Sequence, residues 1–455
     1  MANGFSKSDE TKGKVVRSHA IPRGRMALLF SVMLVTAAGN TAMQSVMPSI
    51  GTQLGVNDVW ISLAYTWSAL LWVICAPIWA RRSDRRGRKS MMALGMIGFI
   101  ISMGLCGLIL WLGLAGVIPA IWVLLLFATA RSLYGGFGSA APPAVQAYVA
   151  SRTDRSERTN ALSLIASSFG LGTVLGPALA PLLVFPGLGL TGPFIAFAGF
   201  GVIVLIALRW RLPDDEPQFP ARGKTFNEPL SASSQMGNPE TELDLPNEER
   251  SDHQGKRLSW AEPRVRPWVI AGLVGGHAQA MLLGIVGFLI LDRLGLRSDA
   301  INGAGPIGLV LMAGALATLV AQWGVIPRFN LGPKAATIGG IALASIGVII
   351  FAVSFTLNSI ALGYAIASLG FGLFRPGTTS GTSLAVSRAE QGEASGIVAS
   401  VAGAAFIFAP ALGVFLYNFS EPIAFSLIIG LCAAVFFIGL KQLTSDKISP
   451  RMQAR

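Results

Sequence analysis

The sequence has little charge: 13% of its 455 residues are Asp, Glu, Lys or Arg, whereas 52% are hydrophobic. Soluble domains carry about 25% charged residues, so this deficit excludes an ordinary soluble enzyme, a disordered scaffold and a coiled coil. Cysteine and histidine are also scarce, with three of each. Cys75, Cys106 and Cys432 lie far apart in apolar segments, without pairing or metal-ligand spacing. Because a Walker-type phosphate loop is also missing, we expect no enzymatic activity, no cofactor and no metal.

Long apolar segments, separated by Gly, Pro or clusters of charge, dominate the chain instead. A helix needs about 20 such residues to cross about 30 Å of hydrocarbon. Each crossing segment must be helical, because lipid offers no partners to backbone N–H and C=O groups. The candidate segments are 26–48, 59–80, 91–112, 120–149, 159–184, 191–210, 267–291, 302–324, 335–355, 358–386, 394–417 and 422–441. The sequence therefore predicts an all-α membrane protein with 12 transmembrane helices.

The basic residues lie almost entirely on one side of these segments. With the N-terminus in the cytoplasm, all but four of the 35 Lys and Arg residues fall in cytoplasmic stretches, as the positive-inside rule requires. The exceptions are Arg293 and Arg297 in an outer loop, and Arg131 and Arg375 within spans. We therefore expect a multi-pass protein of the inner (cytoplasmic) cell membrane with both termini inside. The net charge of +12 then reflects topology and not a nucleic-acid partner.

The two halves of the chain share sequence features, since Gly136-Phe137-Gly138 returns as Gly370-Phe371-Gly372. Duplicated six-helix halves are a known architecture of secondary transporters, which hold the substrate near the midplane. The stretch between the halves is acidic and poor in apolar residues, so we expect a disordered linker, with a regulatory role as the alternative. The predicted division is a tail at 1–25, a bundle at 26–210, the linker at 211–266, a bundle at 267–441 and a tail at 442–455.

A charged cluster, Asp84-Arg85-Arg86-Gly87-Arg88-Lys89, separates the second and third segments. Gly87 permits a tight turn, and the basic residues that follow can hold the next helix at the headgroups. Asp84 at a helix end can pair with basic groups or with a helix N-terminus. We expect Asp84, Arg85, Gly87, Arg88 and Lys89 to form a latch in one conformer and to release it in the other.

The fifth segment is rich in small residues, among them Gly172, Gly176 and Pro177. Small residues allow helices to approach closely in lipid, and a proline inside a helix removes one hydrogen bond and bends it. The sequence therefore predicts a hinge in this segment, with generic close packing as the alternative.

These motifs resemble signatures of the major facilitator superfamily. The charged cluster matches its loop motif Gly-x-x-x-Asp-Arg-x-Gly-Arg-Arg/Lys, except that Ala80 replaces the first glycine. Arg131, four residues before Gly135, is similar to its fourth-helix motif. The segment through Gly176-Pro177 resembles its antiporter motif, with Ala180-Pro181 where glycines are usual. The chain is most similar to the bacterial drug:H⁺ antiporters, which implies two pseudo-symmetric six-helix bundles, alternating access and a part for Arg131 in proton coupling or substrate binding.

Few ionisable groups lie well inside the spans. They are Arg131, His277 and Arg375, and every acid maps outside the hydrocarbon. Because a mid-membrane arginine costs about 2.5–3.5 kcal/mol on insertion scales, it should face a polar cavity. His277 is the candidate proton carrier, since histidine titrates near neutral pH, and Asp292 at the outer end of the same span is a second candidate. The alternative for His277 is a packing histidine near Gln279.

Several polar residues are candidates for the substrate cavity. Asn40 and Gln44 are four residues apart and so share a helix face, and with Gln279 and Arg375 they are expected to line this cavity. Two arginines without a carboxylate between them would favour an anionic or zwitterionic substrate. The alternative is that each arginine binds backbone groups freed by nearby Gly and Pro.

Three functions remain open at this stage. The first, favoured by the fifth segment, is proton-coupled efflux of a small organic molecule such as a drug or metabolite. The second, favoured by the buried arginines, is transport of an organic anion such as a carboxylate siderophore or an acid. The third is a membrane receptor or scaffold whose linker recruits partners. The expected partners are a small-molecule substrate, protons and the lipid bilayer, and the sequence does not indicate an oligomeric state.

Overall fold

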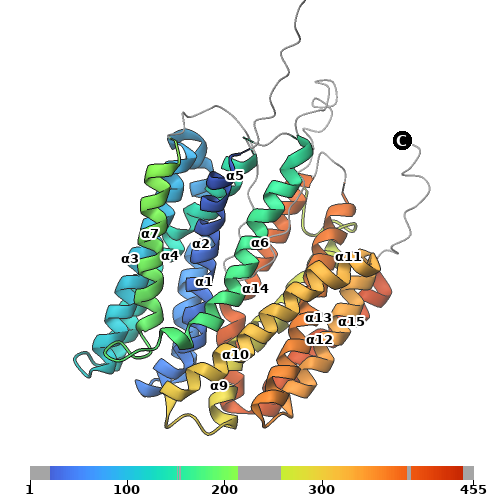
Figure 1. Ribbon diagram of the computed structural model, residues 1–455. Helices are drawn as coiled ribbons and strands as arrows, with labels where there is room; N and C mark the ends of the chain where they lie inside the picture. The colour runs from blue at the N-terminus through green and yellow to red at the C-terminus, as the bar shows by residue number, and fades with distance from the viewer. Residues whose placement is uncertain (1–20, 151, 153–154, 214–257, 387–390, 444–455) are drawn as a thin grey trace, which may run out of the picture.

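The computed structural model describes residues 21–150, 152, 155–213, 258–386 and 391–443 (Figure 1). This part of the chain is helical, and its only β-type pairing is an isolated bridge between Phe185 and Gly189. The elements of the first half are α1 Arg23–Gln53, α2 Asp58–Arg86, α3 Arg88–Leu114, α4 Ala120–Gly136, η1 Gly138–Ala140, α5 Ala141–Ala150, α6 Arg155–Leu179, η2 Pro181–Leu183 and α7 Gly192–Arg211. Those of the second half are α9 Arg266–Arg293, α10 Ala300–Leu319, η4 Val320–Val325, α11 Ile326–Phe329, α12 Pro333–Ala352, α13 Leu357–Leu384, α14 Gln391–Phe419 and α15 Glu421–Gln442.

Within the described residues, 11 helices are long and apolar enough to cross a membrane. Two of them are composite: α4, η1 and α5 together form the span Ala120–Val149, and α10, η4 and α11 form Ile301–Phe329. The remaining predicted span corresponds to α6, a helix of 25 residues whose first turns are polar. The all-α membrane fold expected from the sequence is confirmed.

The helices form two bundles that repeat the same packing. In the first, α1 packs on α6 and α7, and α3 packs on α4 and α5; in the second, α9 packs on α14 and α15, and α12 packs on α13. Close approach depends on small residues in both halves. A Cβ atom on Gly95 would lie 2.5 Å from the backbone N of Ala141, and one on Gly347 would collide with the backbone of Ala367. The internal repeat of the sequence is therefore visible as equivalent helix pairs.

The two bundles also contact each other. The contacts join α2 to α14, α6 to α10, and α1 to both α9 and α10. We call the end at which α1 begins and α15 finishes the tail end, and the opposite one the far end (Figure 1). Pro48 of α1 packs against the backbone of Gly287 in α9. A Cβ atom on Gly308 of α10 would lie only 2.6 Å from the carbonyl oxygen of Pro177 in α6. These close approaches between the halves lie toward the far end.

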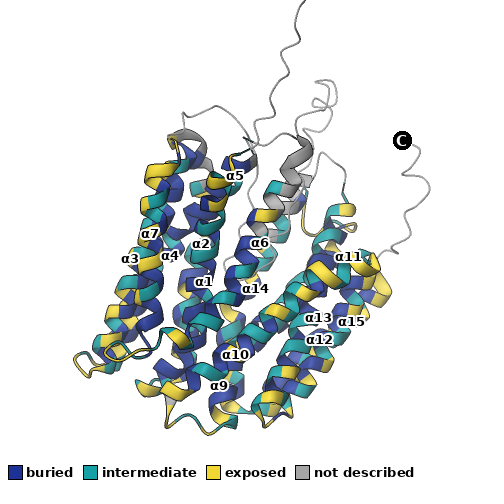
Figure 2. Ribbon diagram, viewed as in Figure 1, coloured by how far each residue is buried: buried dark blue, intermediate teal, exposed yellow. Residues whose placement is uncertain are grey.

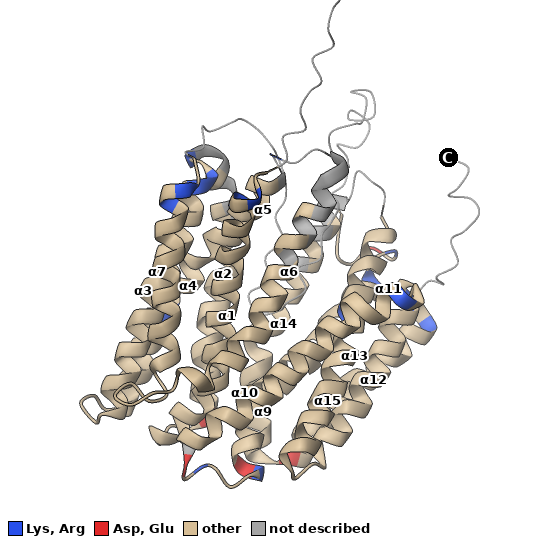
Figure 3. Cartoon of the chain, viewed as in Figure 1, with Lys and Arg blue, Asp and Glu red and all other residues tan. Residues whose placement is uncertain are grey.

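The outer surface of the bundles is apolar. Many large hydrophobic residues are exposed, for example Trp122, Ile203 and Phe408. Exposed residues occur along the helices of both bundles (Figure 2). Such an area of exposed apolar surface marks contact with lipid. Lys and Arg gather at the tail end, and most of the described Asp and Glu lie at the far end (Figure 3).

The charged cluster between the second and third spans is more helical than the sequence suggests. The second span, expected at 59–80, continues as α2 to Arg86, and α3 begins at Arg88. Gly87 alone separates the two helices, with φ 85° and ψ 143°. A side chain is strained at such a positive φ, so the turn between these helices requires glycine.

Candidate functional site

A central cavity lies at mid-depth between the two bundles. A water-sized sphere can move through about 110 Å³ of it, which is room for several water molecules. α1 and α6 line it from the first bundle, and α9, α10, η4, α13 and α14 line it from the second. Its polar lining consists of Thr41, Gln44, Thr173, Gln279, Thr318, Gln322, Tyr364, Ser368 and Arg375. Gln44, Gln279 and Arg375, which were expected to line a substrate cavity, therefore meet in one.

Two amide groups of this cavity are buried without a partner in the described part of the chain. These are the Oε1 atom of Gln279 and the Nε2 atom of Gln322. A buried polar atom without a hydrogen bond costs about 1–3 kcal/mol. An acceptor and a donor are therefore available for a ligand that enters the cavity.

Arg131 lies inside the first bundle and is only 3% exposed. Its NH2 group donates a hydrogen bond to Oδ1 of Asn40, and its guanidinium carbon lies 4.5 Å from the ring centre of Tyr134 and 6.0 Å from that of Tyr65. Its Nε and NH1 atoms have no hydrogen-bond partner among the described residues. The positive charge therefore rests on one amide and on aromatic faces. Asn40, expected in the substrate cavity, is the acceptor for Arg131 and is not part of the lining of the central cavity.

His277 lines neither of the two cavities described here. Its Nδ1 lies 2.7 Å from the carbonyl oxygen of Leu273, one turn earlier in α9. A proton on Nδ1 makes this a hydrogen bond from the imidazole to its own helix. The placement favours the interpretation of His277 as a packing residue.

Asp292, the second candidate for proton coupling, belongs to a charged bridge at the far end. Arg297 donates to Oδ1 and Oδ2 of Asp58 through NH1 and NH2, both at 2.9 Å. The same guanidinium binds both oxygens of Asp292, at 2.7 and 3.0 Å. Tyr417 donates its hydroxyl to Oδ2 of Asp292 at 2.8 Å. We call Asp58, Asp292, Arg297 and Tyr417 the far-end bridge, and it joins the two halves through the Asp58–Arg297 pair.

The far-end bridge is partly shielded from solvent, since the Asp58 side chain is 6% exposed and that of Arg297 is 34% exposed. Burial alone would lower the pKa of Arg297, but the hydrogen bonds and ion pairs with Asp292 and Asp58 outweigh it and raise this pKa. Arg297 therefore stays positively charged at any physiological pH. Next to it, Arg293 pairs with Glu421 and donates to the carbonyl oxygen of Ala352 at 3.0 Å.

Sequence reasoning missed Asp58, Arg297 and Tyr417 as functional candidates. A usable signal was present, because Arg297 is one of only two basic residues in the outer loops. A basic residue that breaks the positive-inside pattern calls for a local acidic partner.

The small residues of α6 serve two interfaces. A Cβ on Gly172 would lie 2.6 Å from the carbonyl oxygen of Leu34, and one on Gly176 would collide with the α1 backbone. This contact lets Thr41 donate to the Gly172 carbonyl oxygen at 3.4 Å. Pro177 faces α10 of the other bundle at Gly308. α6 therefore lies between its own bundle and the opposite one.

The expected latch is described only in part. Asp84 and Arg85 belong to the last turns of α2, and their side chains lie outside the description. Arg88 is buried at 8% exposure and Lys89 is half-buried at the start of α3.

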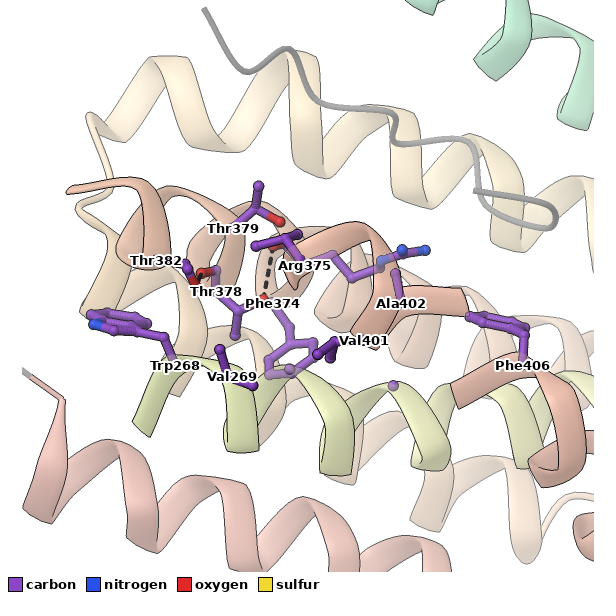
Figure 4. A pocket seen from close by; sticks show the side chains of 13 residues that line it. Trp268, Val269, Phe374, Arg375, Thr378, Thr379, Thr382, Val401, Ala402 and Phe406 are labelled. Atoms are coloured by element: carbon purple, nitrogen blue, oxygen red, sulfur yellow. Dashed lines mark hydrogen bonds between the residues drawn. The ribbon is translucent and has the colours of Figure 1, made fainter. Parts of the chain in front are cut away.

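A second cavity, which we call the side pocket, lies within the second bundle near the tail end (Figure 4). It lies between α9, α13 and α14, and a water-sized sphere can move through about 30 Å³ of it. Arg375 and Phe406 line both the side pocket and the central cavity. The guanidinium carbon of Arg375 lies 5.9 Å from the ring centre of Phe406.

Comparison with known proteins agrees with this architecture. The sequence profile of the Major Facilitator Superfamily matches residues 29–377. A structure of a bacterial homolog to the human lysosomal transporter Spinster, in an inward-facing and unoccupied conformation, superposes with a TM-score of 0.66. That superposition covers 95% of this chain and 100% of the other, at 15% sequence identity.

Two curated relatives are a homolog of the multi-drug resistance efflux pump PmrA from Lactococcus lactis and a probable actinorhodin transporter from Streptomyces coelicolor. The first is 33% identical over 30% of this chain and 30% of its own length, and the second is 26% identical over 80% of this chain and 66% of its own. The chain therefore spans less than two thirds of the length of these relatives.

A duplicated bundle of membrane-crossing helices around a central cavity is a known architecture of secondary transporters. Since the family profile covers most of the sequence, the chain belongs to the Major Facilitator Superfamily. It is a multi-pass membrane protein of a family whose members are transporters.

Proposed function

We propose that this chain exports a small organic molecule, a drug or a metabolite, in exchange for protons by alternating access. The observation that carries the proposal is the central cavity at mid-depth between two bundles that are joined at the far end. The name of the Lactococcus lactis relative, an efflux pump, supports the direction of transport. The contact of α6 with both bundles supports a hinge there, in agreement with the resemblance of this helix to the antiporter motif.

The tail end is assigned to the cytoplasm in this proposal. Its support is the concentration of Lys and Arg at that end (Figure 3), which the positive-inside rule favours. The far end then faces the outside, and the far-end bridge closes the outer side of the cavity. The conformation described here is accordingly inward-facing. The latch that includes Gly87 would be formed in one of the two conformations, inward-facing or outward-facing, and released in the other.

Asp292 is the proton acceptor in this mechanism. With two carboxylates and one guanidinium, the far-end bridge has a formal charge of −1, and a proton on Asp292 brings it to zero. Protonation therefore changes the free energy with which the far end closes. Coupling requires this feature, because protonation and substrate occupancy must bias the same two-state equilibrium.

The experiment uses the purified full chain in proteoliposomes that contain a pH-sensitive dye. Tetracycline, ethidium and 1-anilinonaphthalene-8-sulfonate are added in turn, and proton flux opposite to the movement of the probe is recorded. We expect substrate-dependent proton flux with at least one probe. In Asp292→Asn this flux is lost, while exchange of labelled for unlabelled probe continues, because the residue couples protons and does not bind the substrate.

Asp299→Asn is the matched control, since Asp299 lies in the loop that follows α9 but its side chain binds Asn302 and not the far-end bridge. Its proton flux should equal that of the parent. Absence of proton flux with every probe in the parent protein would refute proton-coupled export. Normal coupling in Asp292→Asn would refute only the role of Asp292.

A further inference from the structure

Two glutamine amides in the lining of the central cavity carry a buried atom without a hydrogen bond. Gln279 belongs to α9 and Gln322 to η4, and both line this cavity. Among the described residues, neither Oε1 of Gln279 nor Nε2 of Gln322 has a hydrogen-bond partner. Buried polar atoms in folded proteins are almost always paired. These two atoms are therefore groups that a molecule inside the cavity can satisfy.

The backbone at Gln322 departs from the regular α-helix. η4 is a π-helical turn of six residues, and it lies within the span that α10 and α11 complete. Such turns are rare and occur frequently at functional sites. In this turn Ala321 is fully buried, and a Cβ atom on Gly372 of α13 would lie 2.9 Å from the Cβ of Ala321, whereas Trp323 is exposed. The π-helical turn thus holds Gln322 between a residue packed on α13 and one at the surface of the bundle.

The threonine hydroxyls of the central cavity are already engaged. Each of the three threonines that line it donates its hydrogen to a carbonyl oxygen of its own helix, at distances of 2.7 to 3.0 Å: Thr41, Thr173 and Thr318. A ligand therefore gains no hydrogen bond from these hydrogens without breaking an existing one. The unpaired atoms of Gln279 and Gln322 require no such exchange.

The two unpaired atoms differ in the chemistry that satisfies them. Oε1 of Gln279 requires a donor, and Nε2 of Gln322 requires an acceptor. An ammonium group has donors only and a carboxylate has acceptors only, so either group alone would leave one of the two atoms unpaired. An uncharged amide, lactam or urea has an N–H and a C=O side by side and can satisfy both. A site with polar groups that must be paired discriminates strongly against a ligand that lacks the partner.

The free space of the central cavity limits the size of this group. A water-sized sphere can move through about 110 Å³ of it, whereas an apolar cavity of about 150 Å³ holds one benzene molecule. A bulky drug therefore does not fit within this space in the conformation described. A small molecule, or the polar end of a larger one, does.

We propose that the central cavity binds an uncharged amide group of the transported molecule, or a group with the same adjacent N–H and C=O, with Gln279 as the acceptor and Gln322 as the donor. This inference rests on the proposed function, because it names the substrate class of the same transporter. It narrows that class from small organic molecules in general to those with a small, uncharged group of the amide type.

The test is equilibrium binding to the purified full chain in detergent, without a proton gradient, measured by saturation-transfer NMR titration. The probes are propionamide and methyl ethyl ketone, which differ only in that a methyl group replaces the amide NH₂. Propionate, in which an oxygen replaces the same NH₂, is the anionic probe. We expect saturable binding of propionamide to the parent protein, and weaker binding of propionate.

The variants separate the two hydrogen bonds. In Gln279→Leu the acceptor for the ligand N–H is lost, so the affinity for propionamide should fall by about 3- to 10-fold relative to that for the ketone. In Gln322→Leu both compounds lose the donor to their carbonyl oxygen. Both affinities should therefore fall, while their ratio stays within about twofold of the parent ratio. Gln442→Leu, which removes an exposed glutamine at the end of α15, should change neither affinity.

Several results would overturn the proposal. They are the absence of saturable propionamide binding to the parent, tighter binding of propionate than of propionamide, and an unchanged ratio of affinities in Gln279→Leu. Because no gradient is applied, the result is independent of coupling. Proton flux in proteoliposomes without propionamide binding would refute this inference alone, and propionamide binding without proton flux with any probe would refute proton-coupled export alone.

Discussion

Arg131 shows how one buried charge is accommodated in the first bundle. Its hydrogen-bond partner is the amide of Asn40, which lies 91 residues away in the sequence. A carboxylate would neutralise the guanidinium more completely, but an amide leaves the positive charge in place. The rings of Tyr65 and Tyr134 compensate in part through their negative faces. One amide and two aromatic faces therefore surround the guanidinium inside the bundle.

Replacement of Asn40 should show how much the hydrogen bond to Arg131 contributes to stability. In Asn40→Leu the guanidinium loses its acceptor, and we expect a loss of about 1–3 kcal/mol in stability. The apparent Tm of the purified protein in detergent should fall by several degrees. In Asn40→Asp a carboxylate faces Arg131, and the Tm should equal or exceed that of the parent.

The matched control for this prediction is Asn358→Leu, because Asn358 is exposed near the start of α13. Its Tm should not change. An unchanged Tm in Asn40→Leu would show that the hydrogen bond to Asn40 contributes nothing to stability. An equal fall of the Tm in both leucine variants would show that the introduced leucine lowers stability, and not the loss of the acceptor for Arg131.

At this scale the sequence identifies charges but not their partners. Arg131 and Arg375 stand out because they interrupt apolar segments, and a charge in lipid requires compensation. The acceptor of Arg131 and the Asp58–Arg297 pair, 239 residues apart, depend on tertiary contacts that no local pattern encodes. For this reason the sequence indicated neither the contact of Asn40 with Arg131 nor the far-end bridge.

At the scale of elements, α6 packs against α1 with almost no space between the two helices. Gly176 lies directly against the α1 backbone, and no side chain larger than hydrogen fits there. We expect Gly176→Val to force α6 away from α1, with a loss of about 1–3 kcal/mol typical of overpacking. The Tm in detergent and the initial rate of transport should both fall.

Gly199→Val is the control, because the space around Gly199 in α7 is open. This variant makes the same glycine-to-valine substitution within a helix, at a position without a close neighbour. Its Tm and its initial rate of transport should therefore stay near the values of the parent. If the two variants behaved alike, the close approach of α1 and α6 would have no part in stability or transport.

The elements themselves were largely predictable. Lengths of apolar sequence gave the spans, since each must cross the same thickness of hydrocarbon. The break between α2 and α3 was harder, because Arg81 to Arg86 form a helix although they are mostly charged. Hydropathy locates the edge of the lipid and not the end of a helix, which can continue into water. The actual end is set by Gly87 and its positive φ.

At the scale of the whole molecule, the far-end bridge decides which end of the cavity is closed. Asp58 opens α2 in the first half, and Arg297 lies between α9 and α10 in the second. The pair therefore breaks when the halves separate at that end. A change of about 1.4 kcal/mol in this contact alters the ratio of closed to open molecules tenfold. One substitution should thus shift the conformational equilibrium measurably.

Asp58→Asn removes a charge from the far-end bridge and leaves Arg297 with Asp292 alone. We expect the far end to open in a larger fraction of molecules. Spin labels on Trp60→Cys and Ile301→Cys, two exposed positions at the starts of α2 and α10, report the separation of the halves by pulsed electron paramagnetic resonance. The labels require a background in which Cys75, Cys106 and Cys432 are replaced by alanine.

The distance distribution for this label pair should gain a longer component in Asp58→Asn, because the contact between the halves is weakened. Glu262→Gln is the control, because Glu262 pairs with Arg264 within one short segment at the tail end. This substitution removes an ion pair that does not join the halves. Its distance distribution should therefore match that of the parent. The same distribution in all three proteins would mean that the Asp58–Arg297 pair does not hold the far end closed. Apolar contacts such as that of Pro48 with Gly287 would then be sufficient to close the far end. Protonation of Asp292 would not change this closure.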